Sequence, residues 1–271
     1  MTQTLTFQPF GPEHLDGALR LSEQARWPHR RDDWALVAAI SKGVVALEDD
    51  RIVATALATP FGDAAMANMI IVDESMRGRG LGREIMLRAM DCATPGQWRL
   101  VATQSGLPLY EKLGFSACGM VHQRQGHLLA DCVATQARPA LAADLDAIRQ
   151  MDREATQADR SGLIDLLAAR GQLAIIEGKG YAAIRPFGRG HVVGPVIADD
   201  AETARDLLSQ LFAGRRGAFL RVDTADLTGL EDWLAGLGLV EVDRGIAMRR
   251  GGLPENKGRF MRFALAAQAL G

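Results

Sequence analysis

The chain has 271 residues, of which 48% are apolar and 24% are charged, with 31 basic and 33 acidic side chains. At about 150 residues per domain, this length allows one large domain or two ordinary ones, and either can bury a sizeable core. The apolar fraction excludes a disordered chain, and the net charge of −2 excludes a generally basic surface made for nucleic acid.

No run of residues approaches the roughly 18 apolar side chains that span a bilayer, and the N-terminus lacks the basic start and apolar stretch of an export signal. We therefore expect no membrane partner. The three cysteines are odd in number and do not have CxxC spacing, which indicates neither a disulfide framework nor a zinc site. The expected setting is the reducing cytoplasm, with no bound metal.

Short strands and helices alternate through the first half of the chain. The apolar periodicity and the turn residues predict, in chain order, a strand over 4–10, helices over 12–25 and 32–41, a hairpin over 43–58, a strand buried on both faces over 66–72, a helix over 82–93, a strand over 98–103, a short helix over 106–114 and a final strand over 115–123. This alternation predicts an α/β fold.

The second half repeats this order of elements. Pro60-Phe61-Gly62 recurs as Pro186-Phe187-Gly188, and Leu113-Gly114 recurs as Leu237-Gly238. The shared order of these matches predicts two copies of one fold, residues 1–135 and 136–271, with the boundary in the polar stretch near Thr135. Chance similarity between two unrelated α/β halves is the alternative.

The most specific motif is Arg77-Gly78-Arg79-Gly80-Leu81-Gly82, which lies between a buried strand and an amphipathic helix. Its alternate glycines let the backbone pass close to a ligand, and N–H groups at a helix N-terminus favour an anion such as a diphosphate. The motif is not a P-loop, because no Gly-Lys-Ser/Thr follows, and its spacing differs from the GxGxxG of dinucleotide-binding loops. A purely structural turn is the alternative.

Residues 72–86, VDESMRGRGLGREIM, resemble the acetyl-coenzyme-A loop of the GNAT N-acetyltransferase superfamily, whose pattern is Gln/Arg-x-x-Gly-x-Gly/Ala. Downstream, LPLYEKLGF resembles the second signature of that family. The likeness is strong in the first half, while the second half resembles a degenerate copy. It implies a mixed, mostly antiparallel twisted sheet flanked by helices, the α/β (α+β) fold of this superfamily, in two tandem copies.

The resemblance also implies roles for individual residues. The strand before the loop would splay from its neighbour and offer backbone groups of Ile70, Ile71 and Val72 to the pantetheine arm, with the Ile70 N–H polarising the thioester carbonyl. Tyr110 matches the tyrosine that protonates the departing thiolate in many members. Acetyl-coenzyme A would be the co-substrate, and its pyrophosphate would lie on the residues of the loop, Arg77, Gly78, Arg79, Gly80, Leu81, Gly82 and Arg83.

The motifs do not supply a general base. Some members of the family have a glutamate four residues before the polarising position, where this chain has Met66. His29, beside Trp27, lies between the first two helices, from which such proteins usually build the acceptor site; an exposed loop histidine is the alternative. Four further candidates remain. Asp73 and Glu74 lie beside the loop and are expected to be solvated, and His122 and His127 lie near the last strand.

The repeat gives an expectation for the second half. In its frame the glycine loop corresponds to residues 203–208, which contain no glycine and place Asp206 where a phosphate would lie. Trp233 or Leu234 corresponds to Tyr110. The second half is therefore expected to shape the acceptor pocket rather than bind acetyl-coenzyme A, with two further arginines, Arg185 and Arg189, near that pocket.

The expected function is transfer of an acetyl group to a primary amine, on a small molecule or a protein, by direct attack through a tetrahedral intermediate. A non-catalytic acyl-coenzyme-A sensor is the second hypothesis, because Met66 leaves the base unassigned. A dinucleotide-dependent enzyme ranks third. No nucleic-acid partner is expected.

Overall fold

The computed structural model describes residues 5–252 and 258–271, which build one 13-stranded sheet flanked by helices. The elements of the first half are β1 (Leu5–Pro9), α1 (Leu15–Gln24), α2 (Arg31–Ala39), β2 (Lys42–Glu48), β3 (Arg51–Phe61), β4 (Ala64–Val72), α3 (Leu81–Met90), β5 (Gln97–Ala102), α4 (Leu107–Lys112) and β6 (Ser116–His127). Those of the second half are β7 (Arg138–Pro139), α5 (Leu145–Thr156), α6 (Ser161–Arg170), β8 (Gln172–Ile176), β9 (Gly180–Phe187), β10 (Gly190–Ala198), α7 (Ala201–Phe212), β11 (Phe219–Ala225), α8 (Glu231–Gly236), β12 (Val240–Gly251) and β13 (Met261–Ala264).

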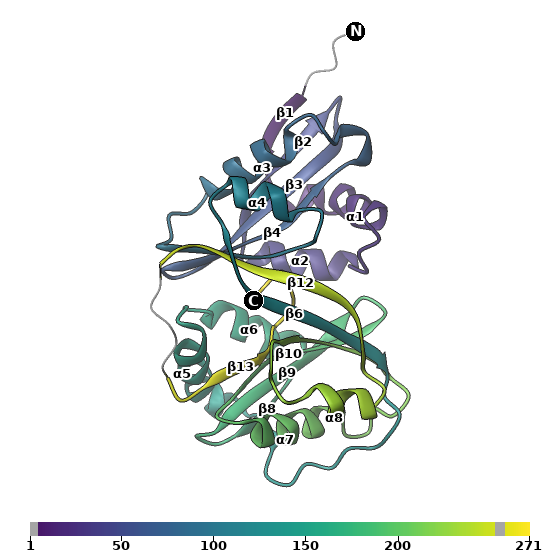
Figure 1. Ribbon diagram of the computed structural model, residues 1–271, viewed down its shortest axis with the longest axis vertical. Helices are drawn as coiled ribbons and strands as arrows, with labels where there is room; N and C mark the ends of the chain where they lie inside the picture. Colours follow the sequence, from purple (N-terminus) through teal and green to yellow (C-terminus); the bar gives the residue numbers. More distant parts are fainter. Residues whose placement is uncertain (1–4, 253–257) are drawn as a thin grey trace.

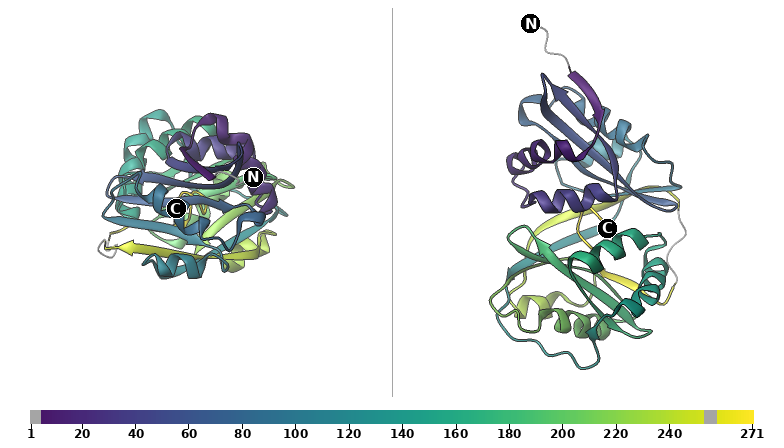
Figure 2. Two further views of the ribbon diagram at one scale, coloured as in Figure 1. Left: turned by 90° about the horizontal axis from the view of Figure 1, so that it is seen from above. Right: turned by 180° about the vertical axis from the view of Figure 1, so that it is seen from behind.

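The two halves have the same order of helices and strands up to β6 and β12, after which the second half adds β13, and they are stacked along the long axis of the molecule (Figure 1). Neighbouring strands are antiparallel except at β4–β5 and β10–β11, which occupy the same place in the two halves. The predicted mixed, mostly antiparallel sheet in two tandem copies is confirmed. Seen from behind, α1 and α2 lie on the same face of the sheet as α5 and α6 (Figure 2).

One strand of each half, β6 and β12, lies against the sheet of the other half. The strand order β5-β12-β6-β11 places β12 between β5 and β6, with Ile246 opposite Ala102 and Val240 opposite Gln125. The sequence predicted β6 as the last strand of the first half, but it pairs with β12 and β11 and not with β5. The division near Thr135 falls in the connection from β6 to β7 and stays a prediction about chain organisation, since the halves share one sheet.

The repeated Pro-Phe-Gly segments are hairpin turns that contact the opposite half. The turn after Phe61 meets the connection between α5 and α6, where the Asp159 N–H donates to the Phe61 carbonyl oxygen at 3.0 Å. The turn after Phe187 meets the start of α2, where the Gly188 N–H donates to Asp33 Oδ2 at 3.1 Å. The repeat noticed in the sequence thus marks reciprocal contacts between the halves.

A buried ion pair joins the halves at the second of these turns. Asp33 Oδ1 accepts from Arg185 Nη1 at 3.2 Å, and Asp33 Oδ2 also accepts from the Arg30 backbone N–H at 2.9 Å. Burial by itself would raise the pKa of Asp33, but these hydrogen bonds and the charge of Arg185 together hold it below its usual value. Burial lowers the pKa of Arg185 to about 10, against the opposing effect of Asp33.

Asp33→Asn is expected to lower the free energy of unfolding by about 3 kcal/mol, because it leaves the buried Arg185 charge without its partner. Urea unfolding at neutral pH measures the loss. The control is Asp16→Asn, which removes the exposed pair with Arg31 at 2.8 Å and should change stability by less than about 1 kcal/mol. Similar losses in the two variants would contradict a role for this contact in joining the halves.

Candidate active site

Strands β4 and β5 diverge in the middle of the first half. They pair in parallel only from Ala64 opposite Gln97 to Met66 opposite Arg99, whereas β4 continues along β3 as far as Val72. A bulge at Met69, whose φ is +50°, bends β4 at this point. The divergence expected from the resemblance is therefore present, and it leaves the edge of residues 67–72 that faces β5 without a paired strand in the part of the chain described.

The glycine loop provides an open helix N-terminus beyond this edge. Gly78 and Gly80 have φ values of +77° and +80°, and Gly80 is the residue that precedes α3. A Cβ built on either glycine would meet no atom within 4 Å. Within residues 5–252 and 258–271, no acceptor is found for the backbone N–H groups of residues 78–82. This is the geometry that a phosphate group requires.

The charge around the loop is positive. Arg79 and Arg83 are exposed, and neither forms an ion pair with a described residue. Arg77 lies 3.7 Å from the exposed Glu74. Three arginines at a helix N-terminus fit a diphosphate, because backbone amides and guanidinium groups both favour an anion there.

Asp73, expected to be solvated, is instead buried at the start of the loop. Its Oδ1 accepts from the Ser75 N–H at 3.0 Å and its Oδ2 accepts from Arg51 Nη1 at 2.8 Å. Burial would raise the pKa of Asp73, but these partners outweigh it and hold the pKa below its usual value. Asp73 therefore shapes the turn at the start of the glycine loop, with its carboxylate paired to Arg51.

The predicted correspondence between the glycine loop and residues 203–208 is wrong. β10 ends at Ala198 and α7 begins at Ala201, so the second half has no loop there, and residues 203–208 lie inside α7. Asp206 accepts from the backbone N–H groups of Thr135 and Gln136 at 2.6 and 2.8 Å, and so holds the connection between the halves. Because the second half lacks the loop, a constant offset between the halves pairs the glycine loop with the wrong residues.

The second half also has no opening between its parallel strands. β13 lies between β10 and β11, with Ile197 opposite Arg262 and Thr224 opposite Ala264. It occupies the place that stays open between β4 and β5. The second half therefore lacks both the glycine loop and the slot for a pantetheine arm.

A cavity of about 260 Å³ lies at the open slot and is formed by both halves. It brings together four of the predicted site residues, Ile70, Tyr110, Trp27 and His29. Ile71, Val72 and the loop of residues 77–83 are not part of its lining. From the second half it receives Phe187, Arg189, Arg221, Asp243 and residues 267–269.

Tyr110 reaches this cavity from α4. Its ring packs edge-on against Phe115, with centroids 6.3 Å apart. Burial raises the pKa of Tyr110 to about 12. Its hydroxyl forms no hydrogen bond with any residue that the structure describes. A protonated phenol without a protein partner can donate to a group that enters the cavity.

His29 is not an exposed loop residue. Its ring lies among Trp27, Trp34 and Phe187, with centroid distances of 5.6, 6.5 and 5.4 Å. Burial lowers the pKa of His29 to about 4, with help from Arg221 and Arg185 and against the attraction of Asp33. The imidazole is therefore neutral at physiological pH.

We expect the pH profile of kcat/KM to have no histidine limb near pH 6.5. Because the pKa of His29 is depressed, its neutral form persists as the pH falls, and any limb from this group lies near pH 4. The same shift means that the stabilising contribution of neutral His29 is complete above about pH 6.5 and is lost between there and pH 4. A limb near pH 6.5 that disappears in His29→Gln would contradict this.

Sequence reasoning missed several residues of the cavity because they come from the exchanged strands. Asp243 is carried by β12, and Gln123 and Gln125 by β6. Only the strand exchange brings them beside Ile70. Of the two arginines predicted near the pocket, Arg189 does line it, whereas Arg185 is held in the pair with Asp33.

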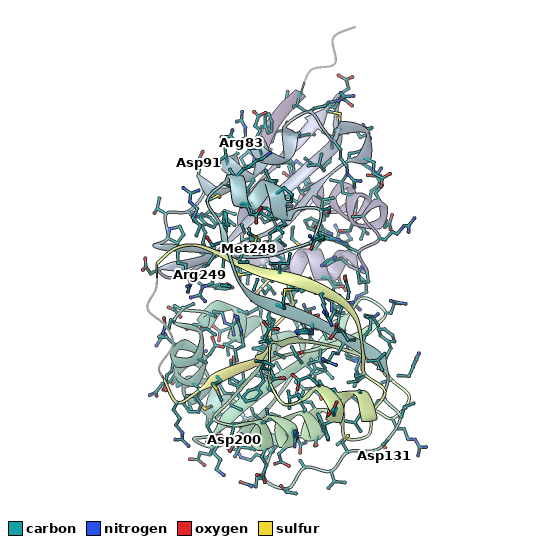
Figure 3. All side chains as sticks on the ribbon, viewed as in Figure 1. Arg83, Asp91, Asp131, Asp200, Met248 and Arg249 are labelled. Atoms are coloured by element: carbon teal, nitrogen blue, oxygen red, sulfur yellow. The ribbon has the colours of Figure 1, made fainter. Side chains whose placement is uncertain are left out.

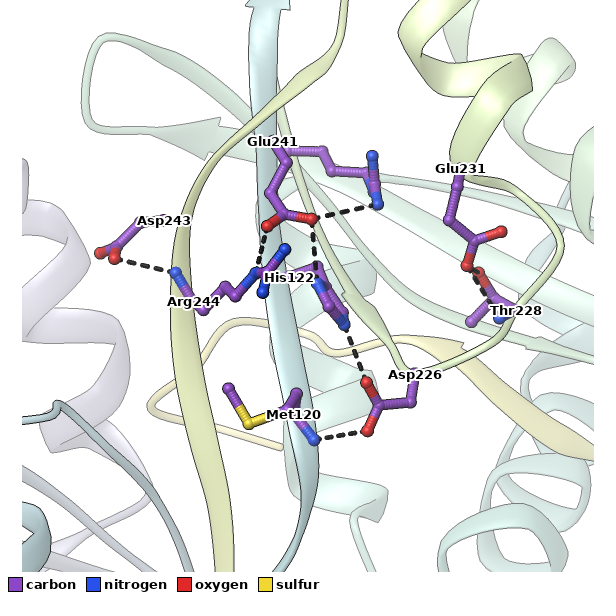
Figure 4. A network of polar contacts seen from close by, with 9 residues as sticks. Met120, His122, Asp226, Thr228, Glu231, Glu241, Asp243 and Arg244 are labelled. Carbon is purple, nitrogen blue, oxygen red and sulfur yellow. Dashed lines mark hydrogen bonds and ion pairs between the residues drawn. The ribbon is translucent and has the colours of Figure 1, made fainter.

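The remaining sequence candidates lie elsewhere. His122 is held between Asp226 Oδ1 and Glu241 Oε2 at 2.8 and 3.0 Å, in a network that ties β6 to β12 (Figure 4). His127 contacts the Gly217 carbonyl oxygen at 2.9 Å. Met66 lines a different cavity. Among the described residues, no group of His, Cys, Asp and Glu is arranged for a metal, and no helix combines the length and hydropathy needed to cross a bilayer.

Comparison with known proteins gives two matches to family models, both described as acetyltransferase (GNAT) domains, over residues 40–117 and 148–261. The chain is 31% identical over 280 residues to the uncharacterized N-acetyltransferase YitH of Bacillus subtilis, with 96% of each chain covered.

Solved structures with the same fold include a putative acetyltransferase from Pyrococcus horikoshii, with a TM-score of 0.84 at 18% identity, covering 100% of this chain and 97% of that one. Another is a tandem GNAT protein from the clavulanic acid biosynthesis pathway, with a TM-score of 0.63 at 13% identity, covering 93% of this chain and 100% of that one.

Proposed function

Because the chain belongs to the GNAT acetyltransferase family in its tandem form, we propose that it transfers the acetyl group of acetyl-coenzyme A to a primary amine. The observation that carries the proposal is the cavity in which Ile70 and Tyr110 of the first half face residues of the second half at the end of the open slot. The odd number of cysteines favours the cytoplasm as the setting.

The first half would hold the donor. The N–H groups of residues 78–82 and the side chains of Arg79 and Arg83 would bind the pyrophosphate, and the edge of β4 beyond Met66 would bind the pantetheine arm. The Ile70 N–H would then donate to the thioester carbonyl oxygen, where negative charge develops during attack. Such a donor contributes about 3 kcal/mol to transition-state stability.

The chemistry would be a direct displacement. The amine nitrogen forms a bond to the carbonyl carbon, the carbon–sulfur bond breaks, and the Tyr110 hydroxyl protonates the departing thiolate. The amine proton would go to a group on the opposite wall, where neutral His29 and the carboxylate of Asp243 are available, directly or through water. Met66 cannot serve, since it lies outside this cavity.

A thiol-release assay tests the proposal. The full chain is incubated with acetyl-coenzyme A and a panel of amines containing amino acids, polyamines, aminoglycosides and peptides with free N-termini. Release of coenzyme A that depends on one amine, together with the acetylated product in a mass spectrum, is the expected result. Tight binding of acetyl-coenzyme A without amine-dependent release across the panel would favour the sensor instead.

A further inference from the structure

A second cavity, of about 370 Å³, lies at the seam between the halves and is lined by residues of both, among them Leu265 and Gly271. Both cavities are lined by β5, β6, β11 and β12. The second cavity is also lined by the end of α5 and the residue that follows it, which correspond in the repeat to the segment after α1 that lines the active-site cavity. In the repeat it therefore takes the place of the acceptor pocket of the second half. The donor slot beside it is filled by β13.

Among the described residues, three arginines line this second cavity. Its lining includes Arg99 from β5, Arg249 from β12 and Arg262 from β13. Figure 3 shows Arg249 at the seam between the two halves. Nothing in the lining is an Asp or Glu side chain, among the residues that the structure describes. A volume above about 300 Å³ suits a small molecule.

The carboxylate that acts on Arg262, that of Asp152, already has partners. Asp152 accepts from Arg160 Nε at 2.9 Å and from the hydroxyl of Tyr181 at 2.5 Å. Arg160 in turn donates to the Gly271 oxygen. Arg160 is thus balanced within the protein, and Asp152 is not free to balance the arginines of the cavity.

The charges of Arg99 and Arg262 are not paired with a carboxylate in this way. Arg99 donates to Gln97 Oε1 at 2.6 Å and to the Thr156 carbonyl oxygen at 2.8 Å, both of which are neutral. The side chain of Arg262 forms no hydrogen bond or ion pair with residues 5–252 or 258–271. Burial, together with repulsion from Arg160 and Arg99 and against the attraction of Asp152, lowers the pKa of Arg262 to about 10. A desolvated guanidinium without a counter-charge is costly, and a bound anion removes that cost.

We propose that this cavity is a binding site for a small oxyanion, a carboxylate or phosphate group of a metabolite, held by Arg262, Arg99 and Arg249. The site is distinct from the active site because it has neither a donor slot nor a counterpart of Tyr110. Gene duplication would have left an acceptor pocket that binds without reacting. Guanidinium groups suit either oxyanion, since both accept paired hydrogen bonds.

Isothermal titration calorimetry on the full chain tests the site with two probes, malonate and inorganic phosphate. Saturable binding of one probe is expected, and the preferred probe identifies the oxyanion class. Arg262→Met keeps the apolar stem and should weaken that binding about 10- to 100-fold. Arg189→Met, in the active-site cavity, should leave it unchanged. An equal loss in Arg189→Met would place the anion in the active site and overturn the proposal.

A second measurement keeps the test independent of activity. Without added anion, Arg262→Met should have a Tm equal to or above that of the wild type, because it removes a partly buried charge that is not paired with a carboxylate. Failure of both probes to bind, with a lower Tm for Arg262→Met, would show that a group of the protein, such as a carboxylate at Gly271, already balances Arg262. That result would overturn the anion site and leave the proposed acetyl transfer untouched.

Discussion

Tyr110→Phe is expected to lower kcat for acetyl transfer by about 100-fold, the usual contribution of a positioned general acid, with the KM for acetyl-coenzyme A within about twofold. The phenol stays protonated because burial raises its pKa to about 12, so its loss removes a proton donor at every physiological pH. Phenylalanine fills the same space, and the hydroxyl has no hydrogen-bond partner among the described residues. Steady-state kinetics at pH 8 measure the effect.

The second tyrosine of the chain provides a matched control. Tyr181 donates to Asp152 at 2.5 Å inside the second half, away from the active-site cavity. Tyr181→Phe should cost about 1 kcal/mol of stability and leave kcat unchanged. A kcat for Tyr110→Phe within twofold of the wild type would remove the acid role from Tyr110.

Gly80→Val is expected to weaken acetyl-coenzyme A binding by more than about 100-fold. Gly80 has a φ of +80°, which a β-branched residue adopts only with strain, so the loop must change shape and its N–H groups turn away from the pyrophosphate. Calorimetric titration with acetyl-coenzyme A measures the affinity, and circular dichroism measures the fold.

The control for strain is Gly178→Val, in the turn between β8 and β9. Gly178 has a φ of +66° and, like Gly80, open space around a built Cβ. Both substitutions should cost similar stability, about 1–2 kcal/mol, but only Gly80→Val should lose the ligand. Unchanged affinity in Gly80→Val would show that the pyrophosphate does not lie on this loop.

Local motifs were the most reliable guide to the site. The glycine loop is contiguous, and its shape depends on the φ values of Gly78 and Gly80 and on the start of the next helix, all of which a short segment determines. Tyr110 and His29 were likewise found from segments of a few residues, and both line the cavity. The burial that depresses the pKa of His29 could not be predicted, because Phe187 comes from the other half.

Matches across the two halves were less reliable. Residues 203–208 were aligned to the glycine loop although the second half has no such loop, because an alignment by turn residues cannot place a deletion. Asp206 was expected to repel a phosphate and instead accepts hydrogen bonds from the segment that connects the halves. The expectation that the second half does not bind the donor rests instead on the position of β13, which lies between β10 and β11.

The sequence by itself determined the repeated order of helices and strands, the position of the glycine loop and the family, because apolar periodicity, turn chemistry and contiguous motifs are local properties. Only the tertiary structure decided which strands are neighbours. The exchange of β6 and β12 depends on backbone pairing between segments more than 100 residues apart, as in Ile246 opposite Ala102, and the insertion of β13 depends on its pairing with β10 and β11. Side-chain pattern does not specify such partners. That pairing gives the candidate active site its second wall and leaves a second cavity, lined by arginines, at the seam between the halves.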